Sequence, residues 1–122
     1  MTCEELIEIV KSHGMTASDS SVNYDNCFYL RWYSPLFSTS GLENVWGTVY
    51  YDPITFKVRH IMKWTGLNYN KREKCFTFSG NATGRLNQVT PNRLNKLCNQ
   101  VKLKVKEFMI KQKLNKIQDD FN

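Results

Sequence analysis

NVWGTVYYDPITFKVRHIMKW, residues 44–64, reads as a β-hairpin around which the rest of the chain is organised. Side chains of different character alternate with a period of two on both sides of the segment Asp52-Pro53-Ile54-Thr55. Such alternation is typical of half-buried antiparallel strands. Asp-Pro favours a turn, because proline presets the backbone angle that the second turn position needs. We therefore predict two strands joined at Asp52.

Each strand of this hairpin has two alternating sets of side chains. On the first strand, Val45 and Val49 are expected to face the core, and Trp46 and Tyr50 the opposite side. On the second strand, the expected core set is Phe56, Val58, His60, Met62 and Trp64. The other set contains three cations and is Lys57, Arg59, Ile61 and Lys63.

Capping signals mark a helix near each end of the chain. Thr2 and Glu5 form a capping box, and Gly14 stands where a helix of about three turns would end. Thr90 followed by Pro91 predicts the start of a long helix that continues to about Gln118.

Two more strands are expected outside the hairpin. Residues 27–34 alternate between apolar and polar or aromatic side chains and end at Pro35, and residues 74–79 place two phenylalanines on one side. Residues 17–26 are polar and are expected to form a loop. The chain is long enough for one core, so we predict a single α+β domain over residues 1–122. Its sheet is a four-stranded antiparallel meander, with the short N-terminal and the long C-terminal helix packed on one face.

The long C-terminal helix has two apolar stripes on nearly opposite sides. The first is expected to cover the sheet and consists of Leu94, Leu97, Cys98, Val101, Val105, Phe108 and Met109. A straight helix on one sheet leaves the second stripe unexplained. We expect either a bend near Met109 that lets this stripe pack on the chain itself, or an interface with a partner protein or a second copy. The candidate interface residues are Leu103, Ile110, Leu114 and Ile117.

The charge is distributed unevenly along the chain. Residues 1–54 hold two cations and seven acids, whereas residues 55–122 hold fifteen cations and four acids. A basic half of this kind attracts polyanions, although lysines also simply solubilise surface helices. Aromatic and basic side chains alternate on the predicted outer face of the sheet, where bases could stack while cations follow the phosphates. The same residue types also tile an ordinary solvated sheet face. The candidate nucleic-acid-binding residues are Tyr29, Arg31, Tyr33, Trp46, Tyr50, Lys57, Arg59 and Lys63 of the strands, with Lys102, Lys106 and Lys113 of the helix.

No catalytic, metal or cofactor signature stands out, so we expect no enzyme activity, no cofactor and no metal site. His60 alternates with Val58 and Met62 and is expected on the core side rather than as a catalytic base. The four cysteines are widely spaced and the N-terminus lacks the pattern of a signal peptide, which favours reduced thiols in the cytoplasm. No apolar run is long enough to span a membrane.

The function expected from these features is non-catalytic nucleic-acid binding. The alternative is a small inhibitor or adaptor that binds an acidic or nucleic-acid-binding protein, or blocks the nucleic-acid groove of such a partner. A sequence rich in Lys, Asn and Ile with little Ala is typical of an AT-rich coding source such as a phage or mobile element.

Overall fold

The computed structural model describes residues 1–19, 26–32, 44–72, 75–78 and 81–121, and for residue 19 and residues 115–121 it describes the backbone alone. In chain order the elements are α1 (Cys3–Ser12), β1 (Thr16–Asp19), β2 (Cys27–Arg31), β3 (Val45–Tyr51), β4 (Val58–Lys63), β5 (Leu67–Asn70), β6 (Cys75–Phe78), β7 (Gly84–Leu86) and α2 (Pro91–Phe121).

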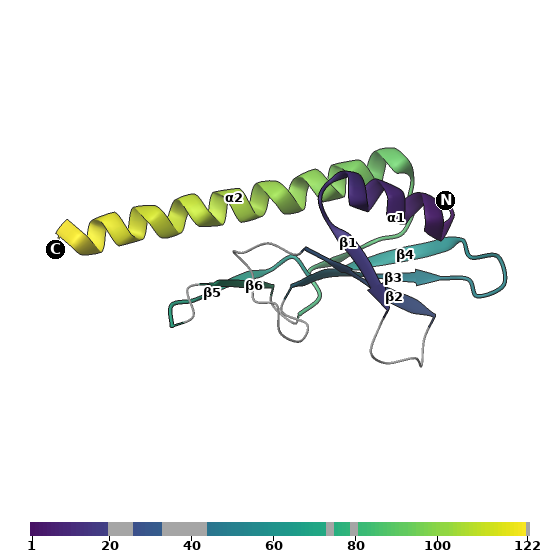
Figure 1. The fold of residues 1–122 in the computed structure, drawn as a ribbon, viewed down its shortest axis with the longest axis horizontal. Helices are drawn as coiled ribbons and strands as arrows, with labels where there is room; N and C mark the ends of the chain where they lie inside the picture. Colours follow the sequence, from purple (N-terminus) through teal and green to yellow (C-terminus); the bar gives the residue numbers. More distant parts are fainter. Residues whose placement is uncertain (20–25, 33–43, 73–74, 79–80, 122) are drawn as a thin grey trace.

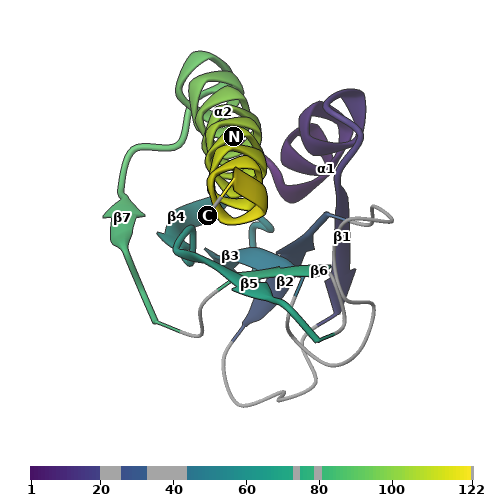
Figure 2. The same cartoon turned by 90° about the vertical axis from the view of Figure 1, so that its left-hand side faces the viewer.

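The described strands form two antiparallel sheets below the two helices. The larger sheet has the order β1-β2-β3-β4-β7, and the smaller one pairs β5 with β6. Both helices lie on the same side of the larger sheet, with α1 beside the first half of α2 (Figures 1 and 2). The predicted α+β class and the placement of both helices on one face are confirmed.

The strand arrangement is richer than the predicted meander. Residues 16–19, most of them in the expected polar loop, form the edge strand β1, in which Thr16 lies opposite Arg31. The predicted strand over residues 74–79 is present as β6, but it pairs with β5. The edge of β4 is taken instead by β7, where Leu86 lies opposite Ile61. β1 and β7 have four and three residues, which is too short for a hydrophobic alternation to indicate a strand.

The predicted helix starts are present with their capping contacts. The backbone N–H of Glu5 donates to the Thr2 hydroxyl at 3.2 Å, and that of Arg93 donates to the Thr90 hydroxyl at 3.3 Å. Gly14 follows α1 with a φ of 76°, a left-handed conformation that glycine adopts without strain. These contacts satisfy backbone groups that a helix end would otherwise leave unpaired.

The core lies between the helices and the larger sheet. Leu6 and Val10 of α1 and the predicted first stripe of α2 meet the sheet there, and Leu94, Leu97, Cys98, Val101 and Val105 are all buried. The sheet contributes Phe28, Leu30, Val49 and Ile61 to this cluster.

The expected core set of β4 was only partly right. Val58 packs against the core as expected, but from His60 onward the faces of this strand are reversed. Ile61 is fully buried opposite Val49, whereas His60 lies opposite Tyr50 and Met62 opposite Thr48. Phe56, placed in the core set by alternation, lies in the turn and is 59% exposed.

In the second stripe of α2, the side chains that the structure describes are more than half exposed. α2 is one unbroken helix whose C-terminal part extends past β5 and β6, so the expected bend near Met109 is absent (Figure 1). Leu103, Ile110 and Leu114 are 55%, 51% and 56% exposed. The side chain of Ile117 lies outside the described residues.

Candidate functional site

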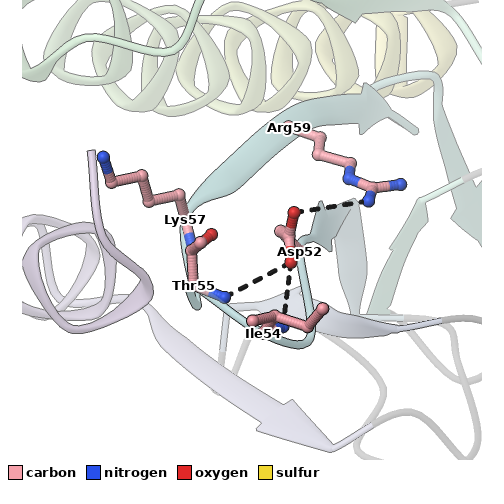
Figure 3. Close-up of polar contacts among 5 residues, drawn as sticks. All are labelled: Asp52, Ile54, Thr55, Lys57 and Arg59. Carbon is pink, nitrogen blue, oxygen red and sulfur yellow. Dashed lines mark hydrogen bonds and ion pairs between the residues drawn. The ribbon is translucent and has the colours of Figure 1, made fainter.

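The turn between β3 and β4 is held by Asp52, as Figure 3 shows. The backbone N–H groups of Ile54 and Thr55 donate to Asp52 Oδ1 at 2.8 and 3.3 Å. On its other side, Asp52 Oδ2 lies 3.6 Å from Arg59 Nη2. The two backbone hydrogen bonds, and then Arg59, hold the pKa of Asp52 below its usual value. Asp52 therefore keeps its charge and ties the turn to the following strand.

A β-bulge at Arg59 sets the geometry of the neighbouring side chains. Tyr50 pairs with His60, but the next residue, Tyr51, pairs with Val58, so Arg59 has no opposite residue. A bulge turns a side chain away from the regular alternation of its strand. It brings Arg59 to the same hollow as Tyr50 and His60, although simple alternation would put it on the other face.

The hollow beside this bulge has a volume of about 390 Å³ and lies on the sheet face that points away from the helices. Its lining is aromatic and basic and consists of Asn26, Tyr50, Tyr51, Arg59, His60, Met62 and Arg85. The rings of Tyr50 and His60 stack with their centroids 4.7 Å apart and their planes 20° apart. Arg59 of β4 and Arg85 of β7 thus lie around one aromatic stack.

The surroundings of His60 favour its neutral form. Arg85 Nη2 lies 3.2 Å from His60 Nε2, and because a guanidinium only donates, Nε2 must accept and the ring proton sits on Nδ1. Partial burial, and then the charges of Arg85 and Arg59, lower the pKa of His60 below its usual value. At neutral pH the positive charge of the hollow therefore comes from the two arginines.

The register of the strands places three of the predicted nucleic-acid-binding residues on the outer face of the larger sheet, namely Tyr29, Arg31 and Tyr50. Tyr29 pairs with Thr48, next to Tyr50, and Arg31 lies over the Tyr29 ring with 5.5 Å to its centroid. Arg31 also donates to the Ser18 hydroxyl and to Asn44 Oδ1, both at 2.7 Å. Arg31 is therefore held in a network that ties β1 and β2 to the start of β3.

The other predicted strand residues lie elsewhere. Trp46 is fully buried in the core cluster, so its expected place on an open face was wrong. Its indole N–H has no hydrogen-bond partner among the described residues. Lys63 pairs with Gly47 and Gly84 on the helix side of the sheet, which corrects its expected place beside Tyr50. Lys57 is exposed near the start of α1, and Tyr33 lies outside the described residues.

Sequence reasoning missed five members of this site, namely Asn26, Tyr51, His60, Met62 and Arg85. The signal for His60 was Ile61, an apolar β-branched residue in an otherwise cationic set, which indicates that Ile61 rather than His60 faces the core. Arg85 reaches the site only because β7 pairs with β4, a contact that three residues of sequence do not reveal.

The predicted lysines of α2 line a different hollow. Lys102, Lys106 and Lys113 surround an apolar floor between α2 and Trp32, on the helix side of the molecule. The structure thus separates the arginines on the outer face of the sheet from the three lysines along α2, while Lys57 and Lys63 belong to neither group.

The described residues give no geometry for metal or thiol chemistry. They contain no group of three His, Cys, Asp or Glu side chains that could hold a metal ion. All four cysteines are free, and burial raises the pKa of Cys98 to about 11, which keeps its thiol protonated. Of the helices in the described part of the chain, none is long and apolar enough to cross a membrane.

Comparison of the chain with protein-family models, with curated proteins and with solved structures finds no match.

Proposed function

We propose that this protein binds nucleic acid without catalysing a reaction, through the hollow around Tyr50 and His60. The observation that carries the proposal is the stack of Tyr50 on His60 with Arg59 and Arg85 beside it. Aromatic rings that accept bases, next to cations that meet phosphates, are the two parts of a sequence-tolerant nucleic-acid site. The basic second half of the chain supports the proposal by drawing a polyanion toward the protein.

Each residue of the hollow has a separate role in this proposal. An unstacked base extends the Tyr50–His60 stack, and phosphate oxygens accept hydrogen bonds from the Arg85 guanidinium. Arg59 contributes less, because Asp52 already offsets part of its charge. Neutral His60 adds ring surface at neutral pH and a further charge once it is protonated.

Fluorescence anisotropy with labelled single- and double-stranded oligonucleotides tests the proposal. Tyr50→Ala should weaken binding about fivefold or more at every salt concentration, because one stacked base contributes about 1–3 kcal/mol. Arg85→Ala should also lower the slope of log affinity against log salt by about 0.7 for single strands, since it removes one phosphate contact.

Lys63→Ala is the matched control, because it removes the same charge from the helix side of the sheet. It should leave affinity nearly unchanged. Equal losses for Lys63→Ala and Arg85→Ala would mean that only net charge matters, and the proposed site would be wrong.

A second candidate function is that of an inhibitor or adaptor that binds a protein partner. The observation that favours it is the exposure of Leu103, Ile110 and Leu114 along one side of α2. Under this proposal Leu114→Asp abolishes partner binding and leaves the fold intact. The partner would be acidic, or would itself bind nucleic acid, and the cytoplasm is the proposed location.

A further inference from the structure

We infer that the hollow between α2 and Trp32 is a docking groove for an acidic amphipathic helix of a partner protein. This groove has a volume of about 380 Å³ and is separate from the proposed nucleic-acid site. It shares no lining residue with the hollow around Tyr50. The inference therefore goes beyond nucleic-acid binding and does not depend on it.

The floor of the groove is apolar and adaptable. It consists of Trp32, Val105, Met109 and Ile110, and the lining residues that the structure describes include no hydroxyl or amide side chain. Methionine adjusts its shape to irregular apolar partners, and tryptophan supplies a large flat contact. An amphipathic helix fills such a groove with side chains spaced at i, i+3, i+4 and i+7. Among the described lining residues Trp32 supplies the one aromatic ring, which suits side chains better than a row of stacked bases.

The rim of the groove selects the charge of the occupant. The rim is lined by Lys102, Lys106 and Lys113. The acid of α2 that is nearest to them in sequence is Glu107. It lies on the other flank of the helix, where it lines another hollow with Lys104 and Lys111. Lysines at intervals along one side pair with Asp or Glu on the flanks of a docked helix. The rim runs from Lys102 to Lys113, about 16 Å along the α2 axis, which corresponds to three turns of a partner helix.

A second copy of this chain is disfavoured as the occupant. α2 holds eight Lys or Arg residues and three acids, so two α2 helices packed side by side would bring like charges together. A helix that makes apolar contact with this groove without charge repulsion must have a negative net charge.

The test uses two fluorescein-labelled synthetic peptides titrated into the full chain. One is an acidic helix former with leucines at i, i+3, i+4 and i+7, and the other has the same composition in scrambled order. The amphipathic peptide should bind with a Kd on the order of 10 μM, and the scrambled one at least about tenfold more weakly. Neither peptide contains tryptophan, so a change in protein fluorescence that is lost in Trp32→Phe places the peptide on the groove.

Matched variants separate docking from charge attraction. Lys106→Ala with Lys113→Ala should weaken binding of the amphipathic peptide about tenfold, whereas Lys104→Ala with Lys111→Ala on the other flank removes equal charge and should cost less than about threefold. Met109→Glu should also weaken binding, and circular dichroism checks that this variant folds.

Three outcomes would overturn the inference. They are no binding of the amphipathic peptide, equal binding of both peptides, or equal losses from the two lysine pairs. A single-stranded oligonucleotide that displaces the peptide, and whose own binding needs Lys106 and Lys113, would reassign the groove to nucleic acid. Loss of oligonucleotide binding in Tyr50→Ala with unchanged peptide binding would instead leave both surfaces as proposed.

Discussion

Among the residues of β4, His60 is the one whose surroundings differ most from the expected ones, because it lies on the outer face of the sheet and not in the core. It stacks on Tyr50, accepts a hydrogen bond from Arg85 and lies in the field of two arginines, all of which its assignment to the core had hidden. The lowered pKa means that the unfolded chain takes up a proton on His60 at a higher pH than the folded chain does. The contribution of His60 to the free energy of unfolding is therefore fully present above the ordinary pKa of histidine. It is lost as the pH falls from that value through the lowered pKa of folded His60.

This argument predicts a pH dependence that one substitution removes. Between pH 7.5 and 5.5 the free energy of unfolding should fall more in the wild type than in His60→Gln, which keeps a polar side chain but does not titrate. Urea denaturation of both proteins at several pH values measures the difference. Parallel pH profiles for the two proteins would contradict the assigned surroundings of His60.

Phe56 is held in an unusual backbone conformation at the tip of the hairpin. Its φ is 55°, in the left-handed region, and its backbone is fixed by Phe56 N–H donating to Asp52 O at 2.8 Å and Cys3 N–H donating to Phe56 O at 2.9 Å. A side chain with a Cβ pays about 1–2 kcal/mol for this conformation, whereas glycine adopts it freely.

Phe56→Gly should therefore be more stable than Phe56→Ala by about 1 kcal/mol, although both lose the contact between the rings of Phe56 and Tyr51. Elsewhere in a strand or helix glycine is the less stable of the two. Chemical denaturation of the pair measures the sign, and an advantage for alanine would contradict the observed backbone conformation.

Leucines of the same helix, α2, lie in different environments. Leu94 is fully buried in the core, while Leu103 is more than half exposed. Leu94→Ala should lower the free energy of unfolding by about 2–5 kcal/mol, because it leaves a cavity. Leu103→Ala should change it by less than about 0.5 kcal/mol. Similar losses at both positions, measured by denaturation, would mean that the second stripe is covered in solution.

The helices and the central hairpin could be predicted because their signals are local. Thr2, Thr90, Pro91 and the Asp52-Pro53 turn act on backbone groups within a few residues of themselves. The pairing of β4 with β7 could not be predicted, because it joins strands that are distant in the sequence. β5 and β6 are joined by a short connection with a turn at residues 71–72, so their pairing has a local signal that the sequence analysis did not use. The bulge at Arg59 likewise breaks a regular alternation without any glycine to mark it.

The candidate site was therefore only partly predictable. Tyr50 and Arg59 were expected among its residues, and the structure brings them to one hollow. Trp46 was a candidate on the outer face, but it is buried because the start of β3 is covered on both faces. Arg85 and His60 became visible only with the register of the sheet.

For the molecule as a whole, two of the basic surfaces differ in their chemistry. The outer face of the sheet offers arginines around stacked rings, and the groove along α2 offers lysines around an apolar floor. The proposals assign nucleic acid to the first and an acidic helix to the second. Because Arg85 and Lys106 belong to separate sites, their substitutions to alanine should act independently, so that each binding partner loses affinity in only one of the two variants.

Mapping of amide chemical shifts by NMR shows where on the protein nucleic acid binds, and so tests binding at the Tyr50–His60 stack. A single-stranded oligonucleotide is titrated into isotope-labelled protein at about 150 mM salt, where weak surface attraction is screened. The account predicts shift changes concentrated at Tyr50, His60 and Arg85, with the lysines of α2 unaffected. Changes confined to α2, or none at this salt concentration, would contradict it.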